Sequence, residues 1–114
     1  MQPEAPALLW DASNAAGLIA TFISGRSFWD YKTDPMLRSA VERQFEIVGE
    51  ALNKLSKVDL QTAAQIPDLR RVVAFRNILA HGYAVVDDEI VWQLATQRLP
   101  ELARVVATLS DDLI

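Results

Sequence analysis

Residues 34–56 read DPMLRSAVERQFEIVGEALNKLS, and this stretch decides the fold. Its apolar residues recur at intervals of three and four, which is the spacing of one face of an α-helix. Asp34 followed by Pro35 is a strong helix start, because aspartate caps free backbone N–H groups and proline fits the first turn. We therefore predict one long helix that ends near residue 56. Its apolar face comprises Leu37, Val41, Phe45, Val48, Leu52 and Leu55.

Helical spacing also appears before this stretch. Residues 8–23 form a second apolar face, with Pro6 at its entry and Gly25 at its exit. The connection 27–33 carries three aromatic residues in seven positions. We expect a loop or a single turn there, covering the edge of the core.

The chain after the central stretch continues the helical pattern. Residues 59–65 fit a short helical turn, and residues 67–82 fit a helix that the glycine at its end stops. A last helical region begins at Asp87 or Asp88, and Pro100 must kink or interrupt it because proline lacks the backbone donor. No strand alternation is visible. We predict an all-α fold, an antiparallel bundle of four or five helices.

The composition is that of a folded chain. Its 114 residues suffice for one domain, residues 1–114, and 51% of them are hydrophobic, with a mean hydropathy of +0.11. No apolar run approaches the roughly 18 residues of a membrane span, and the start of the chain lacks the pattern of a signal peptide. Cysteine is absent, which removes disulfides, thiolate nucleophiles and cysteine-based metal sites. We expect a cytoplasmic protein.

The charge distribution is uneven. The net charge of −4 counts against a protein held on nucleic acid by bulk electrostatics. Residues 65–83 nevertheless carry Arg70, Arg71 and Arg76 against Asp68 alone, a local excess of two positive charges. This local excess is compatible with a nucleic-acid substrate that is bound transiently.

Candidate chemistry concentrates in the sequence RNILAHGY, residues 76–83. It holds the only histidine of the chain, His81, whose side chain can take and give a proton near neutral pH. Arg76 is permanently charged and suits phosphate oxygens, and Asn77 and Tyr83 add polar groups. RNA cleavage by the 2′-hydroxyl needs such a base, an acid and a cation, and it needs no metal.

The spacing within this sequence limits how its residues can meet. Asn77 and His81 are four apart and share a helical face, whereas Arg76 and His81 are five apart, roughly 140° around an ideal helix. Arg76 and His81 therefore meet at one phosphate only if the helix ends near Ala80 or if two chains bring their copies together. A twofold interface between two chains would supply two histidines and two arginines.

Less specific explanations exist for the same residues. A lone histidine at a helix end often bonds a backbone carbonyl or favours the helix dipole. Glu42, Glu46 and Glu50 share one helical face, where a carboxylate metal site is conceivable. A solvated face paired with basic neighbours is the simpler explanation for these glutamates. The basic neighbours are Arg38, Arg43 and Lys54.

The sequence RNILAHGY and its surroundings resemble the HEPN superfamily, specifically the HepT-like proteins. That family's signature is an arginine, four to six residues and a histidine, often with asparagine after the arginine and tyrosine two after the histidine. All four residues are present here. Further similar segments follow the family's order, so the resemblance covers essentially the whole chain. These segments are Glu46–Ala51, Ile66–Pro67, Asp88–Trp92 and Leu99–Leu102.

The resemblance implies an all-helical homodimer that is a metal-independent ribonuclease, with its active site at the dimer interface and no cofactor. Such proteins are toxins of toxin–antitoxin pairs, and their partner is MntA, a minimal nucleotidyltransferase that silences the toxin by adding AMP to the motif tyrosine. By this resemblance Arg76 and His81 would be catalytic, Asn77 would position the site and Tyr83 would receive the AMP. No metal site is implied.

Two other interpretations stay open at this stage. The chain could be a non-catalytic subunit that binds a nucleotide or a nucleotidyltransferase partner without cutting RNA. It could also be a helical dimerisation domain whose His81 is structural. The toxin interpretation alone predicts that the chain by itself is toxic, and the structural one predicts that replacing His81 lowers stability without changing an activity.

Overall fold

A computed structural model describes residues 1–82 and 86–111, and this part of the chain contains helices and no strand. Four long helical segments and two short helices confirm the predicted all-α class. In chain order they are α1 (Ala5–Ile23), α2 (Phe28–Thr33), α3 (Pro35–Val58), α4 (Leu60–Ala63), α5 (Leu69–His81), and the continuous run of α6 (Asp88–Gln93), the π-helix η1 (Leu94–Arg98) and α7 (Leu99–Asp111).

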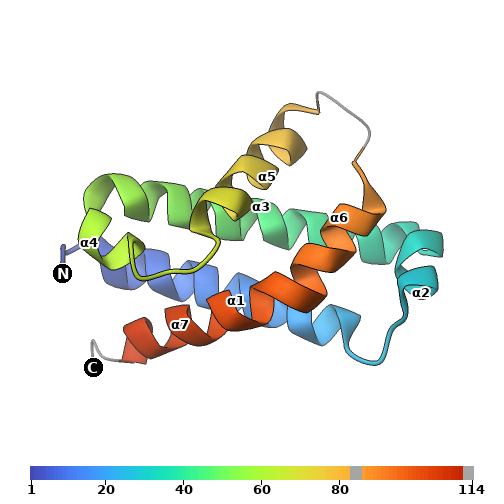
Figure 1. Ribbon diagram of the computed structural model, residues 1–114, viewed down its shortest axis with the longest axis horizontal. Helices are drawn as coiled ribbons and strands as arrows, with labels where there is room; N and C mark the ends of the chain where they lie inside the picture. Colours follow the sequence, from blue (N-terminus) through green and yellow to red (C-terminus); the bar gives the residue numbers. More distant parts are fainter. Residues whose placement is uncertain (83–85, 112–114) are drawn as a thin grey trace.

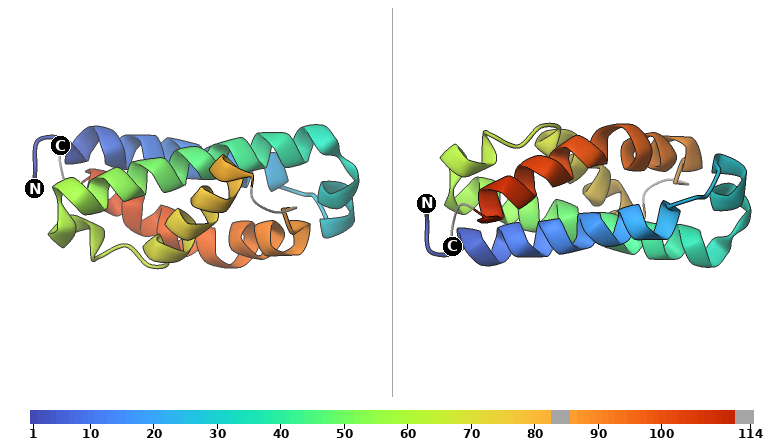
Figure 2. Two further views of the ribbon diagram at one scale, coloured as in Figure 1. Left: turned by 90° about the horizontal axis from the view of Figure 1, so that it is seen from above. Right: turned by 90° about the horizontal axis from the view of Figure 1, so that it is seen from below.

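Helix α3 is the central helix of the bundle. It runs antiparallel to α1 on one side and packs against α5 on another, while α7 packs along α1 (Figures 1 and 2). The carboxyl end of α5 projects from the bundle, which is plain in Figure 1. Within the described ranges, no helix is both long enough and apolar enough to cross a membrane.

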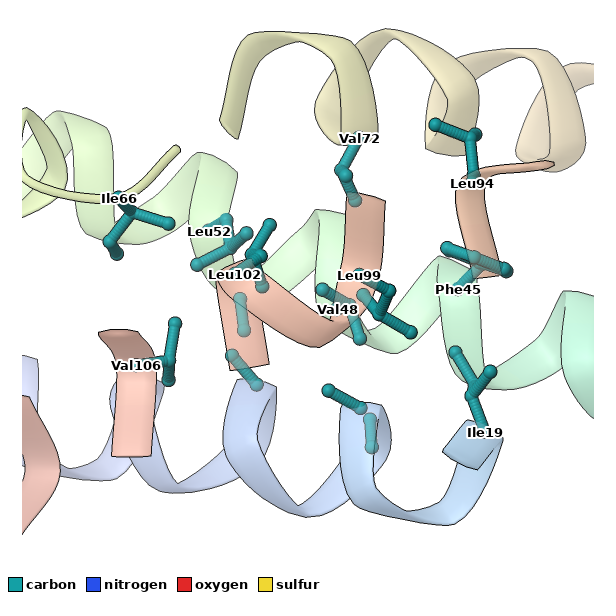
Figure 3. Close-up of a cluster of buried hydrophobic side chains, with 14 of the residues drawn as sticks. Ile19, Phe45, Val48, Leu52, Ile66, Val72, Leu94, Leu99, Leu102 and Val106 are labelled. Carbon is teal, nitrogen blue, oxygen red and sulfur yellow. The ribbon is translucent and has the colours of Figure 1, made fainter. Parts of the chain in front are cut away.

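The core confirms the predicted apolar face of α3. All six of its predicted residues are at most 7% exposed, and Phe45, Val48 and Leu52 are completely covered. Leu102 and Val106 of α7 project between α3 and α1, as Figure 3 shows. Burial of each such side chain contributes roughly 1.5–3 kcal/mol. The local helical pattern and the tertiary core therefore agree.

Helix α2 corrects the expectation of a loop or single turn at residues 27–33. The Asp30 N–H donates to Ser27 Oγ at 3.1 Å, and the Ser27 N–H donates to Asp30 Oδ2 at 2.9 Å. These two hydrogen bonds form a capping box, which stabilises even this short helix. Tyr31 is fully buried, and its ring lies 5.6 Å from that of Trp92. The segment covers the core edge, as expected, but as a helix.

The interruption predicted at Pro100 takes the form of a π-helix. Pro100 is the second residue of α7, and η1 ends immediately before that helix. The Leu99 N–H reaches back five residues to the carbonyl of Leu94, instead of the usual four. Because Pro100 has no N–H and its ring crowds the preceding turn, the wider turn accommodates it without breaking the helical run.

The ends of α5 follow the expected signals in part. Gly82 ends the helix at φ 60°, a left-handed conformation that glycine adopts without cost, and its N–H donates to the Ile78 carbonyl. At the other end Asp68 also has a positive φ, 59°, and its side chain makes no capping hydrogen bond. The stop is therefore confirmed, and the start lacks a side-chain cap.

Candidate active site on helix α5

Helix α5 presents one buried face and one exposed face. Val72 and Phe75 are buried, and the Phe75 ring packs edge-on against Phe45 with centroids 5.4 Å apart. The opposite face carries only exposed residues, at spacings that align them along the helix. These exposed residues are Arg70, Arg71, Ala74, Asn77, Ile78 and His81. His81 thus stands on the exposed face, in the last turn of the projecting end.

Arg76 lies on a different side of the helix, toward α3. Its side chain is only 24% exposed, and Nη2 donates to Glu50 Oε2 at 3.3 Å. Nη1 donates to Asn77 Oδ1 at 3.1 Å. Arginine carries five N–H donors, so these two contacts orient the guanidinium and leave donors for a further anion.

A glycine on α3 makes this arrangement possible. A Cβ atom added to Gly49 would lie 2.2 Å from Arg76 Cβ and 2.8 Å from Arg76 Cγ. Any larger residue there would push α5 away from α3 or displace Arg76. Gly49 therefore sets how closely the stem of Arg76 can approach, and the next residue, Glu50, receives the guanidinium.

Glu50 has two cationic neighbours. Besides Arg76, Lys54 Nζ lies 3.4 Å from Glu50 Oε1. The hydrogen bonds from Arg76 and from Lys54 hold the pKa of the Glu50 carboxyl below its usual range. Glu50 is therefore ionised at neutral pH, and it anchors Arg76 through charge as well as through geometry.

The expectation for the three glutamates of α3 is thus correct in part. Arg43 Nη1 lies 3.5 Å from Glu46 Oε2, and Lys54 pairs with Glu50, as a solvated face predicts. The link from Glu50 to Arg76 was missed, because it joins residues 26 positions apart. The only local signal was Gly49, a glycine inside a long helix. Among the described residues, no three His, Asp or Glu side chains gather as metal ligands.

The structure separates the two principal site residues within one chain. Helix α5 ends at His81, one residue beyond Ala80, so Arg76 and His81 lie five residues apart on one helix whose last residue is the histidine. Arg76 faces α3 and His81 faces outward. Asn77 hydrogen-bonds Arg76 and lies on the exposed face with His81, so it joins the two sides. Tyr83 lies outside the described residues.

An open groove runs beside the exposed face of α5. Its volume is about 900 Å³, and it extends from Asn77 toward the amino end of the helix. Apolar side chains form more than half of its lining, and polar or charged side chains form the rest. The polar and charged side chains are Asn53 and Ser56 of α3, Asp68 before α5, and Arg70, Arg71 and Asn77 of α5.

Comparison with known proteins agrees with this architecture. The family described as Ribonuclease HepT-like matches residues 12–109. A protein named as a putative RNase from Caldanaerobacter subterraneus subsp. tengcongensis is 33% identical over 74% of this chain and 74% of its own length. A protein named as a probable ribonuclease HepT from Thermococcus cleftensis is 31% identical over 82% of this chain and 84% of its own length. No solved structure gives a significant match.

The helical bundle, with an arginine and a histidine separated by four residues at the end of one helix, defines a protein of the HEPN class. Within that class, the chain belongs to the ribonuclease HepT-like family. The match covers every helix that builds the site, including α3 with Glu50 and α5 with Arg76 and His81.

Proposed function

We propose that this chain is a metal-independent endoribonuclease, and that it acts as the toxin of a toxin–antitoxin pair. The observation that carries the proposal is the arrangement on α5. A guanidinium is fixed by Glu50 and Asn77, and a histidine stands exposed one turn further along the helix. Family membership and the RNase names of the relatives support RNA as the substrate.

The chemistry follows from these side chains. The 2′-oxygen attacks the adjacent phosphorus, its proton passes to one imidazole, and the new O–P bond closes a 2′,3′-cyclic phosphate. The bond from phosphorus to the 5′-oxygen breaks, and a second imidazole, protonated at the start, gives its proton to that oxygen. Arg76 stabilises the extra negative charge on the phosphoryl oxygens.

This scheme requires two histidines and therefore two chains. Arg76 and His81 also lie on different sides of α5, which favours a site shared between two chains. A homodimer that pairs the carboxyl ends of α5, around Ile78 and His81, would bring two copies of each to one cleft. Ile78 of α5 is 44% exposed, and its burial would favour such an interface.

Control by an antitoxin completes the proposal. The partner would be an MntA-like nucleotidyltransferase that transfers AMP to Tyr83, two residues after His81. An adenylate there adds a bulky group with a negative charge close to the histidine. RNA would then be excluded by size and by repulsion of its phosphates.

The test is cleavage of a mixed RNA pool by the purified full chain in excess chelator, after intact-mass analysis shows that Tyr83 is unmodified. We expect the parent to cleave and both His81→Ala and Arg76→Ala to lose at least 100-fold in rate, since each removes a group that acts in the transition state. Arg104→Ala is the control, because Arg104 is exposed and paired with Glu101 on α7.

Two results would contradict the proposal. If the unmodified parent leaves RNA intact, the chain is better described as a non-catalytic binding subunit of a nucleotidyltransferase complex. If His81→Ala cleaves as fast as the parent but unfolds at a lower temperature, the histidine is structural. Circular dichroism and gel filtration of each variant separate lost chemistry from lost fold or lost dimer.

A further inference from the structure

A second cationic site lies near the opposite end of α5 from His81. A cleft of about 250 Å³ separates the amino half of α5 from α6 and η1. We call it the Arg71–Arg98 cleft. Its lining contains no carboxylate, and it consists of Arg71, Ile90, Gln93, Leu94, Gln97 and Arg98.

The two arginines of this cleft are not neutralised by the rest of the described chain. Within residues 1–82 and 86–111, Arg43, Arg76 and Arg104 each have a glutamate partner. The side chains of Arg71 and Arg98 have no hydrogen bond or ion pair there. In a chain of net charge −4, two unpaired guanidiniums at one cleft form a local site for an anion.

The π-helix explains why these side chains converge. Gln93 and Arg98 are five residues apart, which on an α-helix would place them roughly 140° apart. The bond from the Leu99 N–H to the Leu94 carbonyl shows that a turn of η1 holds more residues than an α-turn, so Gln93 and Arg98 lie closer to one side than they would on an α-helix. Gln93, Gln97 and Arg98 therefore line one cleft, across from Arg71 on α5.

We propose that the Arg71–Arg98 cleft binds the phosphodiester backbone of the RNA strand, away from the phosphate that is cut. This inference rests on the proposed function for the identity of the ligand as RNA. Arg71 borders both this cleft and the groove that leads to Asn77, so one strand can pass from His81 to the cleft along α5. Ten residues separate Arg71 from His81, roughly 15 Å along the helix.

The chemistry of the lining favours this ligand. Guanidiniums bind phosphate oxygens with paired N–H groups, and the amides of Gln93 and Gln97 offer both donors and acceptors to ribose hydroxyls. Ile90 supplies exposed apolar surface for the face of a base or ribose, whereas Leu94 is buried in the core. An acidic partner protein could use the arginines as well, but continuity with the groove beside Asn77 favours the substrate itself.

The experiment compares the parent with the double variant Arg71→Gln/Arg98→Gln, using Arg104→Gln as the matched control. Each protein is tested in the His81→Ala background for binding to a fluorescent single-stranded RNA across a range of salt concentrations. Loss of two phosphate contacts should lower the slope of log affinity against log salt by about 1.4. If the affinities coincide near 1 M salt, this slope corresponds to roughly 25-fold weaker binding at 0.1 M.

A second readout uses His81-containing proteins and two substrates. A dinucleoside monophosphate has one phosphate, the one that is cut, so it cannot reach the cleft with another. We expect the double variant to cleave it at the parental rate, and to show a KM at least tenfold higher on long RNA with kcat unchanged.

The outcomes separate this inference from the proposed function. One result is that the parent cleaves no RNA while the double variant still has a lower slope of log affinity against log salt than the parent. In that case the cleft binds RNA and the catalytic proposal alone fails. Any one of four results would overturn the inference. The salt slope of the double variant equals that of the parent, or the parent background binds RNA too weakly to measure. Alternatively, the double variant loses cleavage equally on both substrates, or it dissociates into monomers.

Discussion

Replacement of Gly49 by alanine tests the packing that positions Arg76. The new Cβ would lie 2.2 Å from Arg76 Cβ, 2.8 Å from Arg76 Cγ and 3.2 Å from the Val72 carbonyl oxygen. None of these atoms is the free end of a flexible side chain, so α3 and α5 must separate. Overpacking of this kind costs roughly 1–3 kcal/mol or more, and the better helix propensity of alanine returns about 1 kcal/mol.

We therefore expect Gly49→Ala to lower the free energy of unfolding by up to about 2 kcal/mol. Gly17→Ala is the matched control, because Gly17 also lies inside a helix, yet a Cβ there meets no atom within 4 Å. That variant should gain up to about 1 kcal/mol from propensity alone. Urea unfolding at one fixed protein concentration measures both, since dimerisation would make the midpoint depend on concentration.

One result would contradict the predicted difference in stability between the two glycine variants. If Gly49→Ala is as stable as Gly17→Ala, α3 and α5 do not approach as closely as described, and the positioning of Arg76 by α3 is wrong. Arg76→Ala should not rescue Gly49→Ala, because alanine keeps the Cβ atom that makes the shortest contact. A rescue would show that the guanidinium, and not the helix spacing, causes the effect.

Two further predictions concern the ion pair and the capping box. Glu50→Gln should lower ribonuclease activity through Arg76 while costing at most about 1 kcal/mol of stability, since the pair is half-exposed. Because the folded-state pKa of Glu50 is depressed, that stability is present above its ordinary value of 4.5 and is lost as pH falls below it; a parent–variant difference that grows on acidification contradicts this. Ser27→Ala should cost about 1 kcal/mol in thermal unfolding by removing the cap of α2, and Ser27→Thr should largely retain it. Equal loss in both variants would show that the cap is not the cause.

The sequence was most informative where structure depends on neighbours along the chain. The helix from Pro35, the stop at Gly82 and the apolar face of α3 were predicted, because capping and helical periodicity are local. Helix α2 was expected as a loop or single turn, although Ser27 and Asp30 have the spacing of a capping box. Three aromatics in a short connection obscured that signal.

The candidate site was predictable in its members and not in its geometry. Arg76, Asn77 and His81 follow from the motif, and their roles remain predictions, as does that of Tyr83. The anchoring of Arg76 by Glu50 depends on how α3 crosses α5, which no local pattern specifies. The π-turn before Pro100 was expected only as a kink or an interruption of unspecified form, because a proline can also be accommodated by bending the axis.

The separation of Arg76 and His81 around α5 affects how ribonuclease activity would depend on the concentration of the chain. Under the proposed function a lone chain holds half a site, so complete sites form only by encounter of two chains. Well below the dissociation constant, their concentration rises with the square of the chain concentration. A tenfold fall in the chain concentration then lowers the concentration of complete sites about a hundredfold. Under the proposed function, a cell that makes little of this protein tolerates it before any antitoxin acts.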